Sequence, residues 1–171
     1  FVNLEFDFDK RNQKFQTSEG VRSQFYIDVP MISETATLSN TYIYKYFTEL
    51  YENNISSFSI YLRTANSLKD EDIKLSERII LPSNRLRGFE RGKVGPKDGD
   101  DFIGENYAAS LNFSSTIPQI LENSENIDFL VFFDAGNVWG VDYFKGEDEG
   151  SEIRSSFGVG LDWLTPVGPL N

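Results

Sequence analysis

The segment IRSSFGVGLDW, residues 153–163, alternates between two kinds of side chain along its length. Large apolar side chains take every second position: Phe157, Val159, Leu161 and Trp163. Small or charged residues lie around and between them: Arg154, Ser156, Gly158, Gly160 and Asp162. Because successive side chains of a β-strand point to opposite faces, this pattern predicts a strand with one apolar face and one face of small or charged residues.

Two earlier segments, YAASLNFS (107–114) and IDFLVFFDAGNVW (127–139), divide into two faces in the same way, although the second face of 127–139 also includes Leu130 and Phe132. Together the three segments predict a continuous antiparallel sheet, because unbroken alternation fixes which residues share a face. We expect one face to carry the odd-numbered residues Tyr107, Leu111, Phe113, Phe129, Val131, Phe133, Phe157, Val159, Leu161 and Trp163. We expect the opposite face to carry Asn112, Asp134 and Asp162.

Seven segments in all alternate in this way, and they lie near residues 1–9, 20–30, 40–51, 56–67, 105–116, 127–139 and 153–165. They are about 9 to 13 residues long, whereas strands of globular proteins have about 5 to 6 residues and a tilted strand that crosses a bilayer needs about 9 to 11. Aromatic residues lie near the expected strand ends, as in the girdles of membrane barrels: Tyr42, Trp139, Tyr143 and Trp163. The residues alone therefore indicate an all-β fold and leave open a membrane barrel or a soluble β-sandwich.

The composition excludes several classes of function. Acidic residues outnumber basic ones by 27 to 16, which argues against nucleic acid as a partner. The 171 residues include no cysteine and no histidine, so thiol catalysis and most metal and general-base sites are excluded, and no enzyme activity is expected. No metal or cofactor is expected, since KDGDDFIGE lacks the spacing of a calcium loop and GFERGK lacks that of a phosphate loop. The longest apolar run, 129–133, is too short for a transmembrane helix.

One long connection, residues 68–104, contains the basic stretch NRLRGFERGKVGPKDGDDF (84–102). Its closely spaced glycines and its proline disfavour a helix, and its arginines and lysines would be destabilised against lipid. We therefore predict that this connection forms no long helix and bends back over the inner, polar face of the sheet.

Four motifs follow one another along the chain: RLRGFERGKVGPKD, IGENYAASLNF, FLVFFDAGNVW and RSSFGVGLDWLTPVGPL. In order and spacing they resemble the C-terminal barrel of the bacterial surface antigen family of outer-membrane protein insertion barrels, and the resemblance covers essentially the whole chain. It implies an antiparallel transmembrane β-barrel in the outer membrane of a Gram-negative bacterium. This chain would supply a partial barrel of about seven strands with one long inward-folded loop.

The resemblance also implies a function, because members of this family fold other outer-membrane proteins into lipid. The implied partners are unfolded outer-membrane β-barrel clients, assembly-complex lipoproteins and outer-membrane lipid. A complete member has a larger, closed barrel preceded by soluble periplasmic domains, so we interpret the chain as a piece of a longer protein. The alternative is a pore or secretion transporter of the same family.

In the family, the long loop folds into the barrel lumen and the arginine of its Arg-Gly-Phe motif docks on the inner wall. Carried over to this sequence, the loop motif comprises Arg87, Gly88, Phe89, Glu90, Gly95 and Pro96. The implied wall partner is Asp134, which the alternation independently turns inward. Asn112 stands where members often have a glutamate acceptor, so docking is expected to depend on Asp134 alone, or on Asp128 or Asp162 further along the inner wall. This contact either braces a filled lumen or takes a direct part in insertion.

Overall fold

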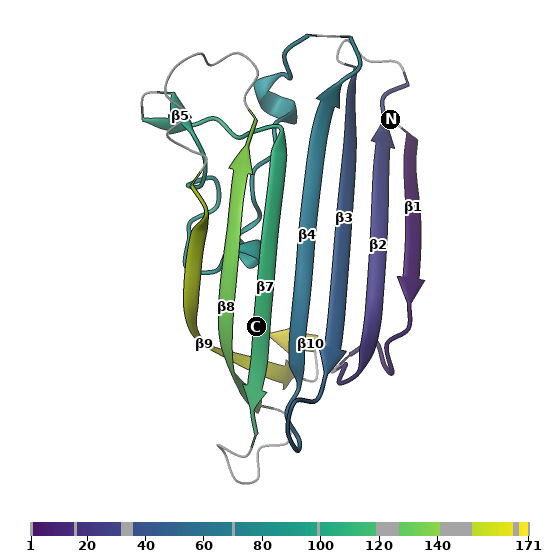
Figure 1. Cartoon of the computed structure of the whole chain (residues 1–171), viewed down its shortest axis with the longest axis vertical. Helices are drawn as coiled ribbons and strands as arrows, with labels where there is room; N and C mark the ends of the chain where they lie inside the picture. The colour runs from purple at the N-terminus through teal and green to yellow at the C-terminus, as the bar shows by residue number, and fades with distance from the viewer. Residues whose placement is uncertain are drawn as a thin grey trace.

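The computed structural model describes residues 2–15, 17–31, 36–69, 71–98, 100–118, 127–140, 152–165 and 168–170. Its long strands are β1 (Val2–Asp9), β2 (Gly20–Val29), β3 (Thr37–Thr48), β4 (Ser56–Ser67), β7 (Tyr107–Ile117), β8 (Ile127–Trp139) and β9 (Arg154–Thr165). With the short β10 (Gly168–Leu170) they form one sheet in the order β1-β2-β3-β4-β7-β8-β9-β10 (Figure 1). All neighbours pair antiparallel, so the all-β antiparallel fold class is confirmed.

Strand β3 begins and ends earlier than the expected range 40–51. Thr37 pairs with Ser67 and Thr48 pairs with Ser56, so the full length of β4 fixes the ends of β3. The apolar Leu50 and Tyr51, which extend the alternation in the sequence, lie exposed in the turn that follows. Tyr42 consequently lies inside the strand, and its expected place near a strand end is wrong.

A further strand, β10, brings the sheet to eight strands where about seven were expected. It pairs Gly168, Pro169 and Leu170 with the last three residues of β9. Glycine and proline are depleted in strands, and proline has no N–H to donate to the ladder, so the sequence carries no strand signal here. The girdle residue Tyr143 lies outside the described residues.

The two faces of the sheet follow the predicted alternation. Phe113 pairs with Phe133, which also pairs with Phe157, and residues paired across strands share a face. The apolar side chains of this outer face are largely exposed in Leu111, Phe113, Val131, Phe133, Phe157, Val159, Leu161 and Trp163. Asn112 pairs with Asp134 on the inner face, as predicted, and Asp128 pairs with Asp162 there.

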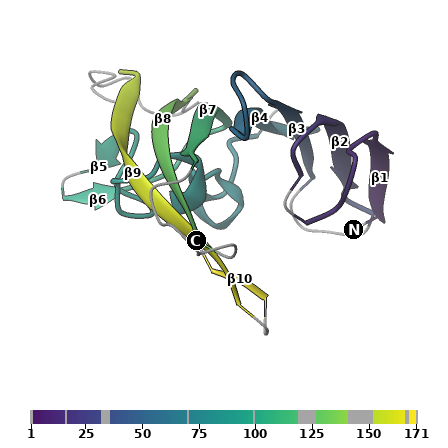
Figure 2. The same cartoon turned by 90° about the horizontal axis from the view of Figure 1, so that it is seen from below.

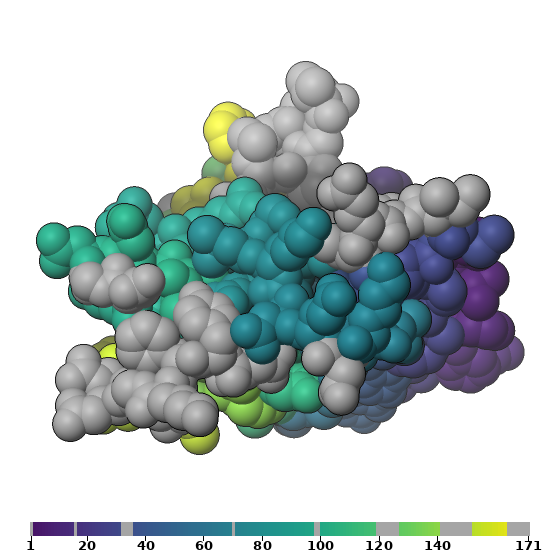
Figure 3. All heavy atoms as spheres, turned by 90° about the horizontal axis from the view of Figure 1, so that it is seen from above, coloured from purple at the N-terminus to yellow at the C-terminus, as the bar shows by residue number. Residues whose placement is uncertain are grey.

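The long connection between β4 and β7 lies against the inner face, beneath β7, β8 and β9 in Figure 2. It contains two three-residue 3₁₀ turns, η1 (Leu75–Glu77) and η2 (Ser83–Arg85), and a small hairpin of β5 (Lys97–Asp98) and β6 (Asp101–Phe102). Seen from above, its atoms, in teal, fill the middle of the molecule (Figure 3). The prediction that this segment forms no long helix and folds over the inner face is thus confirmed for its described residues.

Among the described residues, no helix has the length and apolar character required to cross a membrane.

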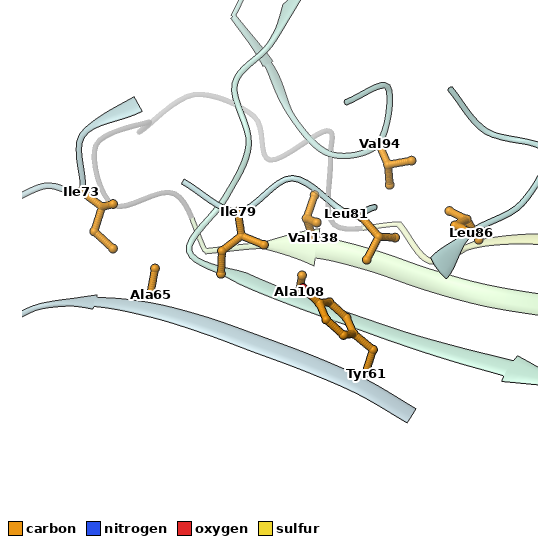
Figure 4. Packing of buried hydrophobic residues seen from close by; sticks show 9 residues of the cluster. All are labelled: Tyr61, Ala65, Ile73, Ile79, Leu81, Leu86, Val94, Ala108 and Val138. Carbon is orange, nitrogen blue, oxygen red and sulfur yellow. The ribbon is translucent and has the colours of Figure 1, made fainter. Parts of the chain in front are cut away.

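Apolar packing holds the connection on the sheet. Five of its side chains, Ile73, Ile79, Leu81, Leu86 and Val94, pack over four inner-face side chains, Tyr61, Ala65, Ala108 and Val138 (Figure 4). The backbones of Ile79 and Glu105 exchange two hydrogen bonds of 2.7 and 3.0 Å, which close the base of the connection. Since fully burying one Leu, Ile or Val side chain contributes about 1.5–3 kcal/mol, this cluster is sufficient to fix the connection on the wall.

Candidate functional site

The candidate site is the contact between the long connection and strand β8. Leu86, only 1% exposed, anchors the chain in the apolar cluster immediately before Arg87. Gly88 follows with φ of +84°, a left-handed conformation that a residue with a Cβ seldom adopts. Between Leu86 and Gly88, Arg87 presents both its backbone N–H and its side chain to the wall.

Asp134 of β8 receives these donors, and its side chain is 0% exposed. Its Oδ2 atom accepts hydrogen bonds from the Arg87 backbone N–H at 3.0 Å and from Arg87 Nε at 2.7 Å, and its Oδ1 atom accepts one from Arg87 Nη2 at 2.7 Å. Two parallel bonds between guanidinium and carboxylate form a bidentate pair, whose fork geometry a lysine cannot reproduce. The ion pair that the resemblance implies is therefore present in the structure.

Asn112 of β7 lies opposite Asp134 of β8, and its side-chain amide is a hydrogen-bond donor to that carboxylate. Family members often have a glutamate acceptor at this position, whereas Asn112 Nδ2 is a donor, to Asp134 Oδ1 at 2.9 Å and to the Arg85 carbonyl oxygen at 2.9 Å. Ser110 Oγ in turn donates to Asn112 Oδ1 at 3.3 Å. A buried carboxylate is stabilised by each donor that it gains, so asparagine supports Asp134 without adding a second negative charge.

Beneath Arg87 lies an aromatic ring. The Arg87 Cζ atom is 3.9 Å from the centroid of Phe132, a cation–π contact that contributes about 0.5–2 kcal/mol. Phe132 pairs with Gly158 of β9, where an added Cβ would lie only 2.8 Å from the ring. Gly158 therefore provides the space in which Phe132 lies flat under the guanidinium. No motif in the sequence singles out Phe132, although the alternation that turns Asp134 inward also turns Phe132 inward.

A second arginine of the connection, Arg85, contacts the wall at β4. Its Cζ atom is 4.8 Å from the centroid of Tyr61, and its Nη1 atom donates to Ser59 Oγ at 3.2 Å. Burial lowers the pKa of Arg85, an effect that Tyr61 partly offsets. A guanidinium remains charged at neutral pH. The two arginines on either side of Leu86 thus fasten the connection to two different strands.

The other residues of the loop motif surround this contact. Phe89 is half-buried against the apolar cluster, Pro96 is buried, and Glu90 is exposed. Gly95 has φ of +109° and lies against Val138 of β8.

Asp162, the remaining predicted wall residue, is half-buried on the inner face beside Asp128. Within the described ranges no hydrogen bond or ion pair joins either carboxylate to Arg87, whose Nε and Nη2 atoms donate to Asp134. The parts of the chain that the structure describes also contain no group of three or more His, Cys, Asp or Glu side chains arranged to hold a metal ion.

Comparison with known proteins gives a consistent result. The sequence profile described as Omp85 superfamily domain matches residues 1–171. An outer membrane protein assembly factor BamA of Neorickettsia risticii (strain Illinois) is 29% identical over 117 residues, which cover 66% of this chain and 16% of that protein. The crystal structure of BamA from Haemophilus ducreyi lacking POTRA domains 1–3 superimposes with a TM-score of 0.84 at 21% identity, covering 98% of this chain and 36% of that chain. This chain therefore has the fold of a barrel segment and spans well under half the length of both proteins.

Proposed function

The chain belongs to the Omp85 superfamily, and from that membership we propose that it forms part of the barrel of an outer-membrane protein assembly factor, which folds β-barrel proteins and inserts them into the outer membrane. Its place in the outer membrane of a Gram-negative bacterium follows from the family. The relative named as such an assembly factor supports the activity.

The observation that carries the proposal is the docking of Arg87 on Asp134. Four donors converge on one fully buried carboxylate, and they join the long connection to two adjacent strands, β7 and β8. A wall braced in this way keeps its curvature and register while the membrane around it is disturbed. We therefore assign the contact a bracing role in insertion rather than a chemical one.

The partners we propose follow from the same assignment. They are unfolded outer-membrane β-barrel clients, the lipoproteins of an assembly complex and outer-membrane lipid. Nucleic acid is not among them, because the net charge of −11 repels phosphate. We propose that the protein acts without enzymatic chemistry and without a cofactor, by its shape and by its effect on the surrounding lipid.

A pore or secretion transporter of the same family is the second candidate, and one observation favours it. The inner face of β1 and β2 is charged: Arg22 forms an ion pair of 2.7 Å with Asp7, and Arg11 forms one of 2.7 Å with Asp9. A polar wall of this kind suits a water-filled passage.

Reconstitution of the full-length protein separates the two functions. Vesicles containing it are mixed with a urea-denatured β-barrel client, and client folding is followed by protease resistance and by heat-dependent gel mobility. We expect faster folding than in empty vesicles, a slower rate with Arg87→Ala, and an unchanged rate with the exposed control Arg91→Ala. Conductance or protein translocation without faster client folding would favour the transporter and contradict the assembly function.

A further inference from the structure

A hollow of about 550 Å³ lies on the outer face of the sheet, at the rim from which the long connection leaves. Leu62 of β4 lies beside the hollow at the level of Ala109, Leu111 of β7 lies at its lower end, and Trp139 of β8 lies at its upper end. Ala109 and Ala135 form the floor, and Ile153, which is 76% exposed and immediately precedes β9, lies at one side. All the lining side chains are uncharged.

The strand register explains why the surface is hollow here. Ala109 pairs with Leu62 on one side and with Asn137 on the other, and Leu111 pairs with Ala135. Two methyl side chains therefore lie among neighbours that reach much further from the sheet. Above them Trp139 is held in place by Tyr107, whose ring stacks on it with centroids 6.0 Å apart.

We propose that this hollow holds one hydrocarbon chain of a membrane lipid from the leaflet at the long-loop rim. The inference rests on the outer-membrane location given above. The hollow is continuous with the exposed apolar band of Leu111, Val131 and Phe133, which in the membrane is the lipid interface. Its volume lies within the ~300–1,000 Å³ typical of ligand sites.

Packing explains why a lipid chain would settle there. A void on a protein surface in hydrocarbon forfeits dispersion contacts on the side that remains empty, and a flexible acyl chain restores them. Trp and Tyr side chains prefer the level of the lipid headgroups. The stacked Tyr107 and Trp139 therefore mark the end of the hollow nearest the headgroup, and the chain runs from Trp139 down toward Leu62 and Leu111.

Fluorescence quenching by lipids with brominated acyl chains tests this proposal directly. The full-length protein is prepared with a single tryptophan, either Trp139 or Trp163, and reconstituted in phospholipid vesicles with and without bromine. Both tryptophans lie on the outer face, but Trp163 lies near the opposite rim, where it pairs with Ile127. The hollow is then filled by Ala109→Leu with Ala135→Leu, and by Ala135→Leu alone in case the double variant folds poorly. Val131→Leu is the control substitution outside the hollow.

We expect brominated lipid to quench Trp139 in the unfilled protein. Filling the hollow should reduce that quenching by about half, because leucine side chains displace lipid from the side of the indole that faces the hollow, while Tyr107 already covers another side. Quenching of Trp163 should stay the same in every variant, and Val131→Leu should leave Trp139 unaffected. Equal quenching of Trp139 with the hollow open and filled would overturn the proposal. Absence of quenching in the unfilled protein would also overturn it, because another part of the protein or a partner would then occupy the hollow.

Discussion

Replacing Arg87 by Ala should destabilise the barrel far more than replacing Arg91, which lies exposed on the same connection. The truncation removes the two guanidinium hydrogen bonds among the four to the Asp134 carboxylate, and it leaves those from the residue-87 backbone N–H and from Asn112. The backbone N–H bond is lost as well if the turn relaxes. Asp134 then remains a buried charge that is paired only with neutral donors.

The expected loss is about 3 kcal/mol in the free energy of unfolding. Breaking a buried ion pair by removing one partner costs about 3–5 kcal/mol. We take the lower end because the Arg87 side chain is 33% exposed, so water can approach Asp134 once the guanidinium is gone. Arg91→Ala should cost less than about 0.5 kcal/mol, as is usual for exposed positions. Arg87→Lys should fall between the two, because it keeps the charge and loses the bidentate fork.

The measurement is urea unfolding of the full-length protein in lipid vesicles, followed by tryptophan fluorescence, with heat resistance on gels as a second readout. A double-mutant cycle of Arg87→Ala and Asp134→Ala isolates the coupling between the two side chains. If Arg87→Ala and Arg91→Ala had equal effects, or if the cycle gave no coupling energy, the docking role of Arg87 would be wrong and only the bulk charge of the loop would matter.

Three further predictions concern neighbouring parts of the structure. Asn112→Asp should cost about 1–3 kcal/mol in unfolding experiments, because it replaces a donor to Asp134 by a like charge; an unchanged midpoint would contradict the donor role. Gly95→Ala should destabilise more than Gly92→Ala, because both glycines have positive φ but only at Gly95 does an added Cβ collide with Val138; equal effects would mean that Val138 moves aside at no cost. Val131→Arg on the outer face should cost about 2–4 kcal/mol in vesicles if it lies near the bilayer midplane, whereas Thr41→Arg on the inner face should cost far less; similar losses would contradict the assignment of faces.

The alternation in the sequence predicts most of the fold because side-chain period and strand geometry are directly linked. Residues 56–67 and 127–139 form strands with the expected bounds. The end of β3 was less predictable, because Leu50 and Tyr51 continue the pattern while the chain turns. There the pairing with β4 determines the strand, and that is a long-range property.

Some features of the candidate site could also be predicted from the sequence, and others could not. The inward direction of Asp134 follows from alternation, and the pairing with Arg87 follows from a resemblance to a family. The donor role of Asn112 depends on the position of the Arg85 carbonyl oxygen, which only the folded loop provides. The space for Phe132 depends on Gly158, its partner on β9. Neither segment alone predicts which of its residues pair with which residues of the other.

The long connection separates two strands that lie side by side, and this has a consequence for the order of folding. Pairing β3 with β4 closes a loop of seven residues (49–55), whereas pairing β4 with β7 closes one of 39 residues (68–106). The longer loop costs ~1.5 kcal/mol more in closure entropy. The sheet should therefore assemble as two hairpin units, β1–β4 and β7–β9, that join late along the β4–β7 boundary. Arg85 contacts β4 and Arg87 contacts β8, so the docked connection reaches both units. The docked connection would then speed the joining of the two units. Its loss would slow that step and would also destabilise the folded sheet.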